Sequence, residues 1–299
     1  MAAKFILNPY AARWSAGKRQ AAAEAALCNA GIAFETVVSD GPGHCTQLAT
    51  EAAQQGFDPI LAGGGDGTIG EVVNGILLAA PKKMPILGIL PLGTANDTVV
   101  NLGLPKDLDA AAAVIAAGNT RNIDVCQVNQ RYFINNAGIG LEPYVTTIQQ
   151  RMTAIKGIAR YLLATLVAIG RNPKWHMKLQ WDDGQYEGPC TLVSIGNSPL
   201  TGGVFYTVPH ADPFDGKLSF VYGYLPTRLG ILSVLPKTMK AAEGNYVEHP
   251  AVHEVHATRL RVQVRPGSPA HADGELISED IQTLEYRIHP AKLPILLPG

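Results

Sequence analysis

The stretch Pro59-Ile-Leu-Ala-Gly-Gly-Gly-Asp-Gly-Thr68 joins a short apolar run to four closely spaced glycines. The segment that follows, residues 68–80, has helical character, so the glycines form a strand-to-helix turn. In such a turn, backbone N–H groups can approach a ligand with no Cβ in the way, and the helix N-terminus adds partial positive charge, which suits a phosphate. The simpler alternative is a tight turn with Asp66 as helix cap, but such a turn needs only one or two glycines.

A second glycine loop, Pro91-Leu-Gly-Thr-Ala-Asn-Asp97, also follows an apolar run and precedes a helical segment. Ligands of open parallel sheets bind beyond the carboxyl ends of the strands, so the two loops predict one nucleotide site. Residues 65–70 formally fit the dinucleotide pattern G-x-G-x-x-G, but the next strand, residues 86–92, lacks the acid that would bind the ribose. A Walker A sequence is absent as well.

Short apolar runs alternate with helix-like stretches around these loops, which predicts a parallel sheet covered by helices on both faces. After about Arg121, extended segments with turn residues dominate, and they indicate a second, β-rich domain. The expected strands are residues 5–7, 34–38, 59–62, 85–91, 175–181, 190–196, 217–224 and 260–264, and the expected helices are residues 15–30, 45–55, 68–80, 107–117 and 154–169.

We therefore expect an α/β fold with two domains. The first, residues 1–122, is a parallel-sheet nucleotide-binding domain to which the tail, residues 283–299, returns. The second, residues 123–282, is the β-rich domain.

The composition excludes several classes of protein. The 299 residues are 46% hydrophobic and 16% charged with a net charge of −1, which rules out intrinsic disorder and argues against nucleic-acid binding along a strongly basic face. Four scattered cysteines without a C-x-x-C pair indicate reduced thiols. No signal peptide is apparent, and the longest apolar run, residues 161–169, is too short to span a bilayer. We expect a cytoplasmic protein.

The order of the motifs resembles the diacylglycerol kinase catalytic-domain family, which includes bacterial lipid kinases, sphingosine kinases and ceramide kinases. The GGDGT motif alone is shared with NAD kinases and phosphofructokinases, whereas the whole series is more specific. The resemblance implies a nucleotide domain followed by a β-sandwich-like domain, with the active site in a cleft between them. The matching motifs are Asn8-Pro9, Gly64 to Thr68, Glu71 to Gly75, Gly93 to Asp97, Asn135 to Gly140, Asp212 to Leu218 and Asp273 to Glu275.

The resemblance also implies an ATP site. Two positions depart from the family pattern: Gly70 stands where an Asn is common, and Thr98-Val-Val100 stands where aromatic and basic residues are usual. Ser39 replaces the usual Thr and keeps the hydroxyl. The implied nucleotide contacts are Asn8, Pro9, Ser39, Gly64, Gly65, Asp66, Gly67, Thr68, Glu71, Thr94 and Asn96.

Phosphoryl transfer requires charge neutralisation, so a Mg²⁺ on the ATP phosphates is implied, with Asp66 as the candidate to orient it. Asp212 and Asp215 lie three residues apart in an expected turn, a spacing that lets both face one hard cation. Asp-Pro and Asp-Gly are also ordinary turn pairs, so the spacing alone is weak evidence. The resemblance implies that these two carboxylates and the carbonyl of Lys217 hold a structural Mg²⁺.

The acceptor hydroxyl loses a proton during transfer, and a positioned carboxylate is the natural base. Asp273 and Glu275 lie on one face if the backbone is extended, although Gly274 allows a departure and a solvated Asp-Gly turn is the alternative. The resemblance favours Glu275 as base, while sphingosine kinases point to Asp66. His271 lies beside this motif, and a lone histidine is more often structural than catalytic.

The function expected from these features is an ATP- and Mg²⁺-dependent lipid kinase that phosphorylates a hydroxyl of diacylglycerol or a related lipid. It would be peripheral to the membrane when active, and a homodimer is one option for its assembly. Residues 158–169, flanked by Lys156, Arg160 and Arg171, either lie against lipid or form a core helix. The alternatives are a soluble kinase of the NAD kinase type and a catalytically weakened nucleotide-binding paralogue.

Overall fold

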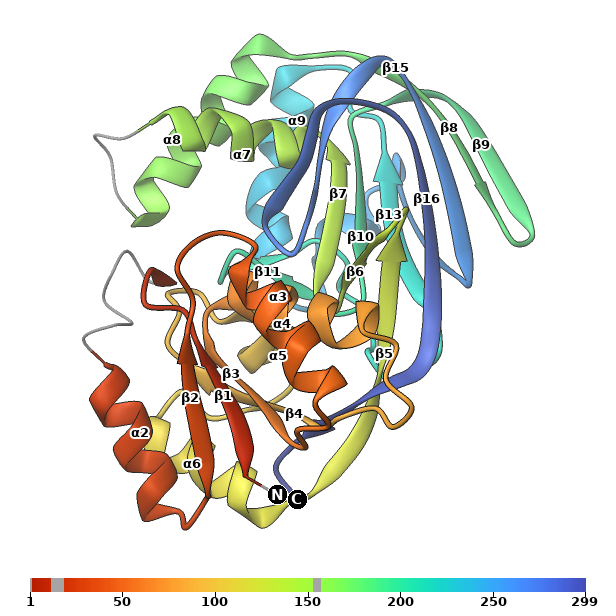
Figure 1. Cartoon of the computed structure of the whole chain (residues 1–299). Helices are drawn as coiled ribbons and strands as arrows, with labels where there is room; N and C mark the ends of the chain where they lie inside the picture. Colours follow the sequence, from red (N-terminus) through yellow and green to blue (C-terminus); the bar gives the residue numbers. More distant parts are fainter. Residues whose placement is uncertain (1, 12–18, 153–156) are drawn as a thin grey trace. The chain divides into compact units, whose positions relative to one another are not determined.

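The computed structural model describes residues 2–11, 19–152 and 157–299 and consists of two compact units (Figure 1). The first unit comprises Met1–Val125, Tyr132–Ile134 and His289–Gly299, and the second comprises Cys126–Arg131 and Asn135–Ile288. β5 (Thr120–Val128), β6 (Arg131–Phe133) and β16 (Glu275–Leu296) contribute residues to both units.

A parallel sheet forms the centre of the first unit. Its strands follow the order β4 (Leu87–Pro91), β3 (Ile60–Gly64), β1 (Ala3–Leu7) and β2 (Phe34–Val38). The end of β16 adds to the β4 edge, where Ile295 pairs in parallel with Leu87. β3 and β4 are buried along their whole length, because helices lie on both faces of a parallel sheet.

The helices of the first unit are α2 (Gln20–Asn29), α3 (His44–Gln54), α4 (Asp66–Leu78), α5 (Asp97–Asn101) and α6 (Leu108–Ala117). α2 and α6 share one apolar core with β1, through residues such as Leu27, Ile115 and Phe5. α3 and α4 pack together closely at Gly75, where a Cβ atom would lie only 2.3 Å from the carbonyl oxygen of Thr46.

The second unit is built on antiparallel strands in the order β14, β13, β10, β7 and β15, and β15 also pairs with β8 and β16. The expected fold class, a parallel α/β domain followed by a β-rich domain, is therefore confirmed. The strands are β7 (Asn136–Gly140), β8 (Trp175–Trp181), β9 (Gly184–Cys190), β10 (Leu192–Gly196), β11 (Leu200–Thr201), β12 (Phe205–Tyr206), β13 (Leu218–Gly223), β14 (Val252–Ala257) and β15 (Arg259–Ala272).

The helices of the second unit are α7 (Leu141–Arg151), α8 (Gly157–Arg171) and α9 (Arg228–Val234), with 3-10 helices at Leu235–Met239 and Tyr246–Glu248. α7 was not expected from the sequence, because Pro143 and several β-branched residues hide its helical pattern. The expected helix over 154–169 is found as α8, and residues 154–156 lie outside the described residues. Among the described residues, no helix is both long and apolar enough to cross a membrane.

Candidate functional site

The glycine loops that follow β3 and β4 lie directly against one another. Leu92 N donates to the carbonyl oxygen of Gly64 at 2.9 Å. A Cβ atom on Gly93 would lie 2.4 Å from Gly65 Cα, a distance that real Cβ contacts do not reach. The two loops therefore pack backbone to backbone, and glycine is required at this contact.

Asp66 is the first residue of α4 and stands half-buried between the two loops. Its Oδ1 accepts a hydrogen bond from Thr98 N, in the first turn of α5, at 2.9 Å. Asp66 does not cap its own helix, whose N-cap is Gly65. Within the described part of the chain its second carboxylate oxygen has no hydrogen-bond partner, so the side chain can bind the neighbouring loop and still offer an oxygen to a ligand.

Asn8 connects the carboxyl end of β1 to the first turn of α4. Its backbone N–H donates to Gly63 O at 3.0 Å, and its Nδ2 donates to Thr68 Oγ1, also at 3.0 Å. Pro9 follows in a turn that is closed by the hydrogen bond from Tyr10 N to Asn8 Oδ1. Asn8 therefore fixes the orientation of the Thr68 hydroxyl at the start of α4.

Ser39 and Asn96 each bury an oxygen atom that has no hydrogen-bond partner among the described residues, namely Ser39 Oγ and Asn96 Oδ1. Ser39 directly follows β2, and Asn96 lies in the loop after β4 with a left-handed φ of 54°. An unsatisfied buried oxygen costs free energy, so a native structure usually offers it a partner. The orphan oxygens fit a polar ligand at the carboxyl ends of these strands, and in the same loop Thr94 is exposed.

Glu71 has a different role from the ligand contact that was expected. Its carboxylate oxygens accept hydrogen bonds from Gly43 N at 3.0 Å and Cys45 N at 3.1 Å, so they cap the N-terminus of α3. Both oxygens are thus engaged with the backbone, and the side chain is buried. Glu71 positions the segment between β2 and α3.

Asn74, on the same helix, makes two hydrogen bonds through its side-chain amide with the backbone of Tyr132 in β6. Its Nδ2 donates to Tyr132 O at 2.7 Å, and its Oδ1 accepts from Tyr132 N at 2.9 Å. This bidentate contact attaches β6 to α4. The Glu71 to Gly75 motif is therefore explained by structure: a cap at its start, a strand anchor at Asn74 and a helix contact at Gly75.

In the second unit, Asp273 and Gly274 form a two-residue hairpin turn between β15 and β16. Their φ values are 47° and 77°, and Ala272 pairs with Glu275 across the turn. Two consecutive positive φ values are typical of a type I′ turn, for which Asp-Gly is a preferred sequence. The interpretation that Asp273 and Glu275 share one face of an extended strand is therefore wrong, and the Asp-Gly turn is what the chain forms.

The two carboxylates of this turn have separate partners. Asp273 is buried, and its Oδ1 accepts hydrogen bonds from Asn135 N at 3.0 Å and Asn136 N at 3.1 Å. Glu275 is 41% exposed at its side chain and pairs with Arg131, with Oε2 at 2.6 Å from Nη2. Asp273 is held inside the unit, whereas Glu275 is open to solvent and fixed in direction by an arginine.

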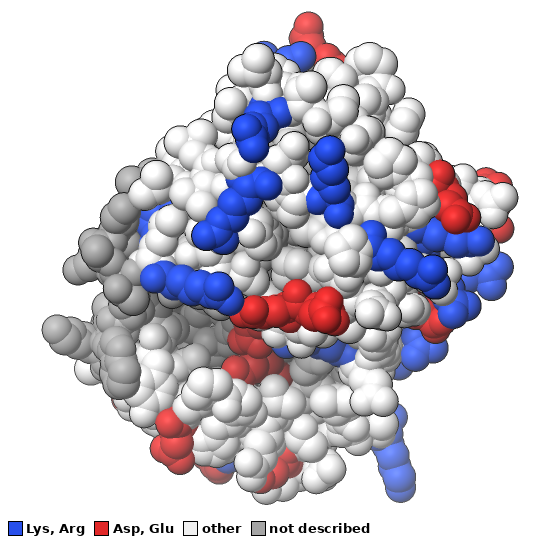
Figure 2. Space-filling model, turned by 90° about the horizontal axis from the view of Figure 1, so that it is seen from above, with Lys and Arg blue, Asp and Glu red and all other residues white. Residues whose placement is uncertain are grey.

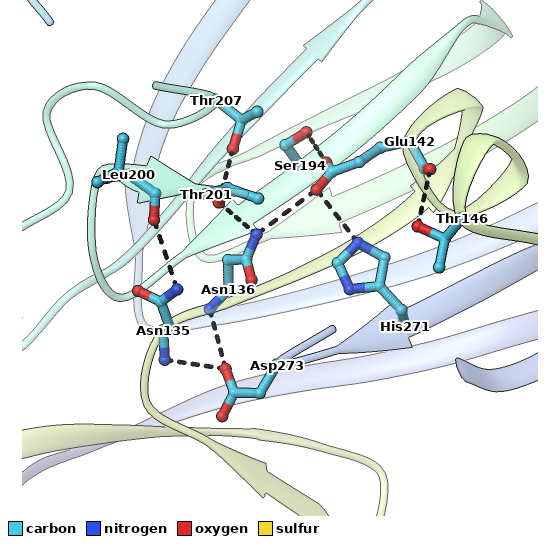
Figure 3. A network of polar contacts seen from close by, with 10 residues as sticks. All are labelled: Asn135, Asn136, Glu142, Thr146, Ser194, Leu200, Thr201, Thr207, His271 and Asp273. Atoms are coloured by element: carbon cyan, nitrogen blue, oxygen red, sulfur yellow. Dashed lines mark hydrogen bonds and ion pairs between the residues drawn. The ribbon is translucent and has the colours of Figure 1, made fainter. Parts of the chain in front are cut away.

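A buried polar network beside this turn was missed from the sequence (Figure 3). Glu142 Oε2 accepts from Ser194 Oγ at 2.6 Å, and Glu142 Oε1 lies 3.2 Å from His271 Nε2. Asn136 Nδ2 contacts both Glu142 and the Thr201 hydroxyl. The signal available in the sequence was an acid two residues after the Asn135 to Gly140 motif, which by itself does not reveal a partner.

Tyr246 is fully enclosed near the same network and donates to Thr207 O at 2.6 Å. Burial raises its pKa well above the ordinary value, and the Glu142 carboxylate raises it further. The phenol therefore stays protonated and neutral beside the buried carboxylate.

The segment Asp212 to Lys217, which the sequence suggests as a metal-binding loop, is largely exposed. It contains two consecutive turns, each closed by a hydrogen bond from a backbone N–H to the Asp side chain two residues earlier. Asp212 Oδ1 accepts from Phe214 N at 3.0 Å, and Asp215 Oδ1 accepts from Lys217 N at 2.8 Å. Each carboxylate keeps its second oxygen for another partner, and carboxylate and carbonyl oxygens suit Mg²⁺. The described residues contain no group of three or more His, Cys, Asp or Glu side chains placed to hold a metal.

Comparison with known proteins identifies the family. The diacylglycerol kinase catalytic domain matches residues 2–128, and the YegS C-terminal NAD kinase beta sandwich-like domain matches residues 135–297. A protein named "Probable lipid kinase YegS" from Escherichia fergusonii is 32% identical over 91% of this chain and 89% of its own length. The chain belongs to the diacylglycerol kinase family of lipid kinases. Its relative of the same name from Shigella flexneri is also 32% identical, over 90% of this chain and 87% of that protein.

Solved structures support the same fold. A diacylglycerol kinase from Bacillus anthracis aligns over 100% of this chain and 97% of its own, with a TM-score of 0.77 and 23% identity. As in other kinases, membership of this family implies ATP as the phosphoryl donor.

Proposed function

We propose that this protein is an ATP- and Mg²⁺-dependent lipid kinase that transfers the γ-phosphoryl group to a hydroxyl of diacylglycerol or a related lipid. The observation that carries the proposal is the pair of interlocked glycine loops at the carboxyl ends of β3 and β4, with the orphan oxygens of Ser39 and Asn96 beside them. The names of the relatives support a lipid as the acceptor.

The nucleotide is bound by the first unit. Backbone N–H groups of the loops after β3 and β4 and the N-terminus of α4 are suited to the phosphates, and the Thr68 hydroxyl, oriented by Asn8, is available to them. The second carboxylate oxygen of Asp66 would orient the Mg²⁺ that neutralises the charge of the phosphates. The remaining proposed contacts are Pro9, Ser39, Gly64, Gly65, Gly67, Thr94 and Asn96.

Glu275 is the proposed general base. The acceptor hydroxyl gives its proton to the Glu275 carboxylate while its oxygen forms a bond to the γ-phosphorus, and the bond from that phosphorus to the β–γ bridging oxygen breaks to release ADP. The ion pair with Arg131 fixes the direction of the carboxylate. Asp273, whose Oδ1 binds two backbone amides, supports the turn and takes no proton in this proposal.

Substitution of Glu275 tests this role. Glu275→Gln should lower kcat by about a hundredfold or more, because a positioned base typically contributes that much, while ATP binding and the thermal unfolding temperature stay unchanged. Glu279→Gln is the matched control, since Glu279 is also an exposed acid paired with an arginine, Arg151, in the same unit. Full transfer activity in Glu275→Gln would remove it from the base role and leave Asp66 as the candidate.

Asp212, Asp215 and the carbonyl of Lys217 are the proposed holders of a structural Mg²⁺. The ion would supply charge compensation to an exposed loop that contains two carboxylates. Addition of MgCl₂ should increase the free energy of unfolding by RT ln(1 + [Mg²⁺]/Kd) and thereby raise the unfolding temperature. Asp215→Asn should reduce that rise in temperature. An equal rise in the variant would contradict the assignment.

The membrane surface is the proposed place of action. Leu162, Leu163 and Leu166 of α8 are 39%, 39% and 52% exposed, and Leu229 of α9, which packs against α8, is 79% exposed. Residues 157–174 and 228–240 contain no acidic residue, whereas their basic residues are Arg160, Arg171, Lys174, Arg228, Lys237 and Lys240.

Apolar side chains on a basic background favour an anionic bilayer as the partner. Figure 2, which views the molecule from above, shows Lys and Arg side chains standing apart on a mostly uncharged surface. Vesicles that contain phosphatidylglycerol should therefore co-float the protein better than vesicles of phosphatidylcholine alone. Leu166→Ser combined with Leu229→Ser should reduce co-flotation severalfold, whereas Leu78→Ser, a 56% exposed leucine of the first unit, should not. Equal loss in the control would contradict this docking face.

A substrate panel tests the proposed function as a whole. Labelled ATP is incubated with purified protein and diacylglycerol, a sphingoid base, phosphatidylglycerol or NAD. Label in a lipid supports the proposal, whereas label only in NAD favours the soluble NAD kinase type, whose β-sandwich the second unit resembles by family description. Binding of ATP without label in any acceptor would indicate a weakened paralogue.

A further inference from the structure

The end of β15, which leads into the Asp273-Gly274 turn, follows an irregular stretch of the sheet. The ladder between β15 and β16 shifts register three times, between Gln263 and Ser268, between Ser268 and Ala270, and between Ala270 and His271. Its last residues, Ala270 to Ala272, pair with both β16 and β7. Register shifts of this kind bend a strand locally, so side-chain contacts at its end can add to the backbone pairing in setting the direction in which the strand enters the turn.

His271 and Glu142 provide such a contact. His271 Nε2 lies 3.2 Å from Glu142 Oε1, and the two side chains are only 5% and 9% exposed. Glu142 lies in the first turn of α7, so the pair joins that helix to the last residues of β15. Because the carboxylate also accepts from Ser194 on β10, three elements meet at one buried acid.

The backbone of β7 is shaped to admit this pair. Gly138 is the residue opposite His271 in the β7–β15 register. A Cβ atom at Gly138 would lie 3.0 Å from His271 Nε2 and 3.2 Å from Glu142 Oε2, tighter than nearly all real contacts. The glycine in the Asn135 to Gly140 motif therefore leaves room for two polar side chains.

Three side chains surround the Glu142 carboxylate. Ser194 and Asn136 donate hydrogen bonds to it, and His271 Nε2 lies 3.2 Å from its Oε1. His271 Nδ1 is buried without a partner among the described residues. The imidazole is thus tied to the protein at one end, through Glu142.

Asn136 connects this pair to the turn itself. Its side chain contacts Glu142, its backbone N–H donates to Asp273 Oδ1 at 3.1 Å, and its carbonyl accepts from Asp273 N at 2.7 Å. In Figure 3, Asp273 lies below Asn136, His271 lies to its right, and Glu142 lies above them. The pair and the turn are consequently parts of one contiguous network.

We propose that Glu142 and His271 are positioning residues, which hold the Asp273-Gly274-Glu275 turn in the direction that Glu275 needs to act as base. The inference rests on the proposed function of Glu275. In this proposal the two residues act through the course of β15 and through Asn136.

The test compares His271→Leu with His271→Gln. Leucine removes the polar contact with Glu142, whereas glutamine places an N–H group near the position of Nε2. His271→Leu should lower kcat about tenfold or more and leave the KM for ATP within about twofold, because misplaced catalytic groups slow chemistry without weakening nucleotide binding. His271→Gln should restore kcat to within about threefold of the wild-type value.

A matched control is available on the same unit. His176 and Glu187 also form a His–Glu pair, at 3.9 Å, but their side chains are 58% and 59% exposed. His176→Leu should leave kcat, KM and amide exchange unchanged. If His271→Leu fails to fold, Glu142→Gln, which keeps the shape of the side chain, replaces it in the comparison.

Hydrogen exchange separates this inference from the proposed function. The backbone amides of residues 272–276 should exchange faster in His271→Leu than in the wild type, and His271→Gln should restore their protection. This result supports the positioning role even if the wild type phosphorylates no lipid of the panel, an outcome that would overturn only the proposed function. Unchanged exchange in His271→Leu, or an unchanged kcat in an active enzyme, would overturn the inference.

Discussion

Ser39 carries the proposed nucleotide site at the scale of a single atom. Its hydroxyl is buried without a partner among the described residues at the carboxyl end of β2. Without a ligand, a buried hydroxyl that makes no hydrogen bond does not stabilise the folded protein. The sequence pointed to Ser39 only through the family resemblance, because a serine after an apolar run has many possible roles. Its burial and missing partner are properties of the packed structure.

Removal of this hydroxyl gives a first prediction. Ser39→Ala should leave the unfolding temperature without nucleotide unchanged or slightly higher, because a buried unsatisfied oxygen is lost, and it should weaken ATP binding severalfold. Calorimetric titration of ATP and thermal unfolding measure the two effects. Ser233→Ala, on α9, is the control with unchanged ATP affinity. A large loss of stability in Ser39→Ala would show that the oxygen has a partner within the fold.

A buried thiol gives a second prediction at the residue scale. Burial raises the pKa of Cys190 to about 12 from an ordinary value of about 9. The unfolded chain therefore loses this proton at a lower pH than the folded protein, so the contribution to stability is complete below about pH 9 and is lost as the pH rises toward 12.

Cys190→Ala removes this titration. Denaturant unfolding between pH 8 and 11 should show a shallower alkaline decline in the variant than in the wild type, with a difference in slope of up to about 1.4 kcal/mol per pH unit from this group. Cys28, which is exposed, serves as the control position. An equal decline in the free energy of unfolding with pH in the wild type and in Cys190→Ala would contradict the assignment.

At the scale of elements, the strands and helices of the first unit follow from their apolar patterns, while α7 and the end of β15 do not. α7 begins with Leu141-Glu142-Pro143, and Glu142 in its first turn contacts Ser194 of β10 and His271 of β15. For Asp273 to Glu275 the sequence allows either an extended strand or an Asp-Gly turn. The structure has the turn, in agreement with the preference of Asp-Gly for two-residue hairpin turns. Long-range partners, such as Arg131 for Glu275, have no local pattern from which they could be predicted.

The contact between α3 and α4 gives a prediction at this scale. Gly75→Ala should destabilise the protein by about 1–3 kcal/mol, because its Cβ would lie 2.3 Å from Thr46 O and 2.6 Å from Ala49 Cβ. Gly170→Ala, within α8, is the matched control: it has open space at the Cβ position and should be neutral or stabilising by up to about 1 kcal/mol. Chemical denaturation measures both, and an unaffected Gly75→Ala would show that the helices separate easily.

At the scale of the whole molecule, the chain enters the first unit three times. Leu293, Ile295 and Leu296 of the last segment are buried in it, and Leu297 N donates to Asn119 O at 3.0 Å. From the sequence, the return of the tail is an expectation without a pairing partner, because periodicity cannot identify the strand with which the tail pairs. That edge, β4, is a property of the topology.

A fragment limited to residues 1–128 should therefore fail to fold stably, although it contains the whole match to the catalytic domain. The edge of β4 would lose a neighbour and the core would lose three large apolar side chains, each worth about 1.5–3 kcal/mol when fully buried. Circular dichroism and thermal melting would show a broad or absent transition. A cooperative melt that matches the full chain would contradict this dependence on the tail.

The returning tail also sets an order in time. During synthesis, residues 289–299 leave the ribosome after every residue of the second unit, yet they complete the sheet whose loops are proposed to bind ATP. The proposed nucleotide site would thus be complete only after the second unit has been translated.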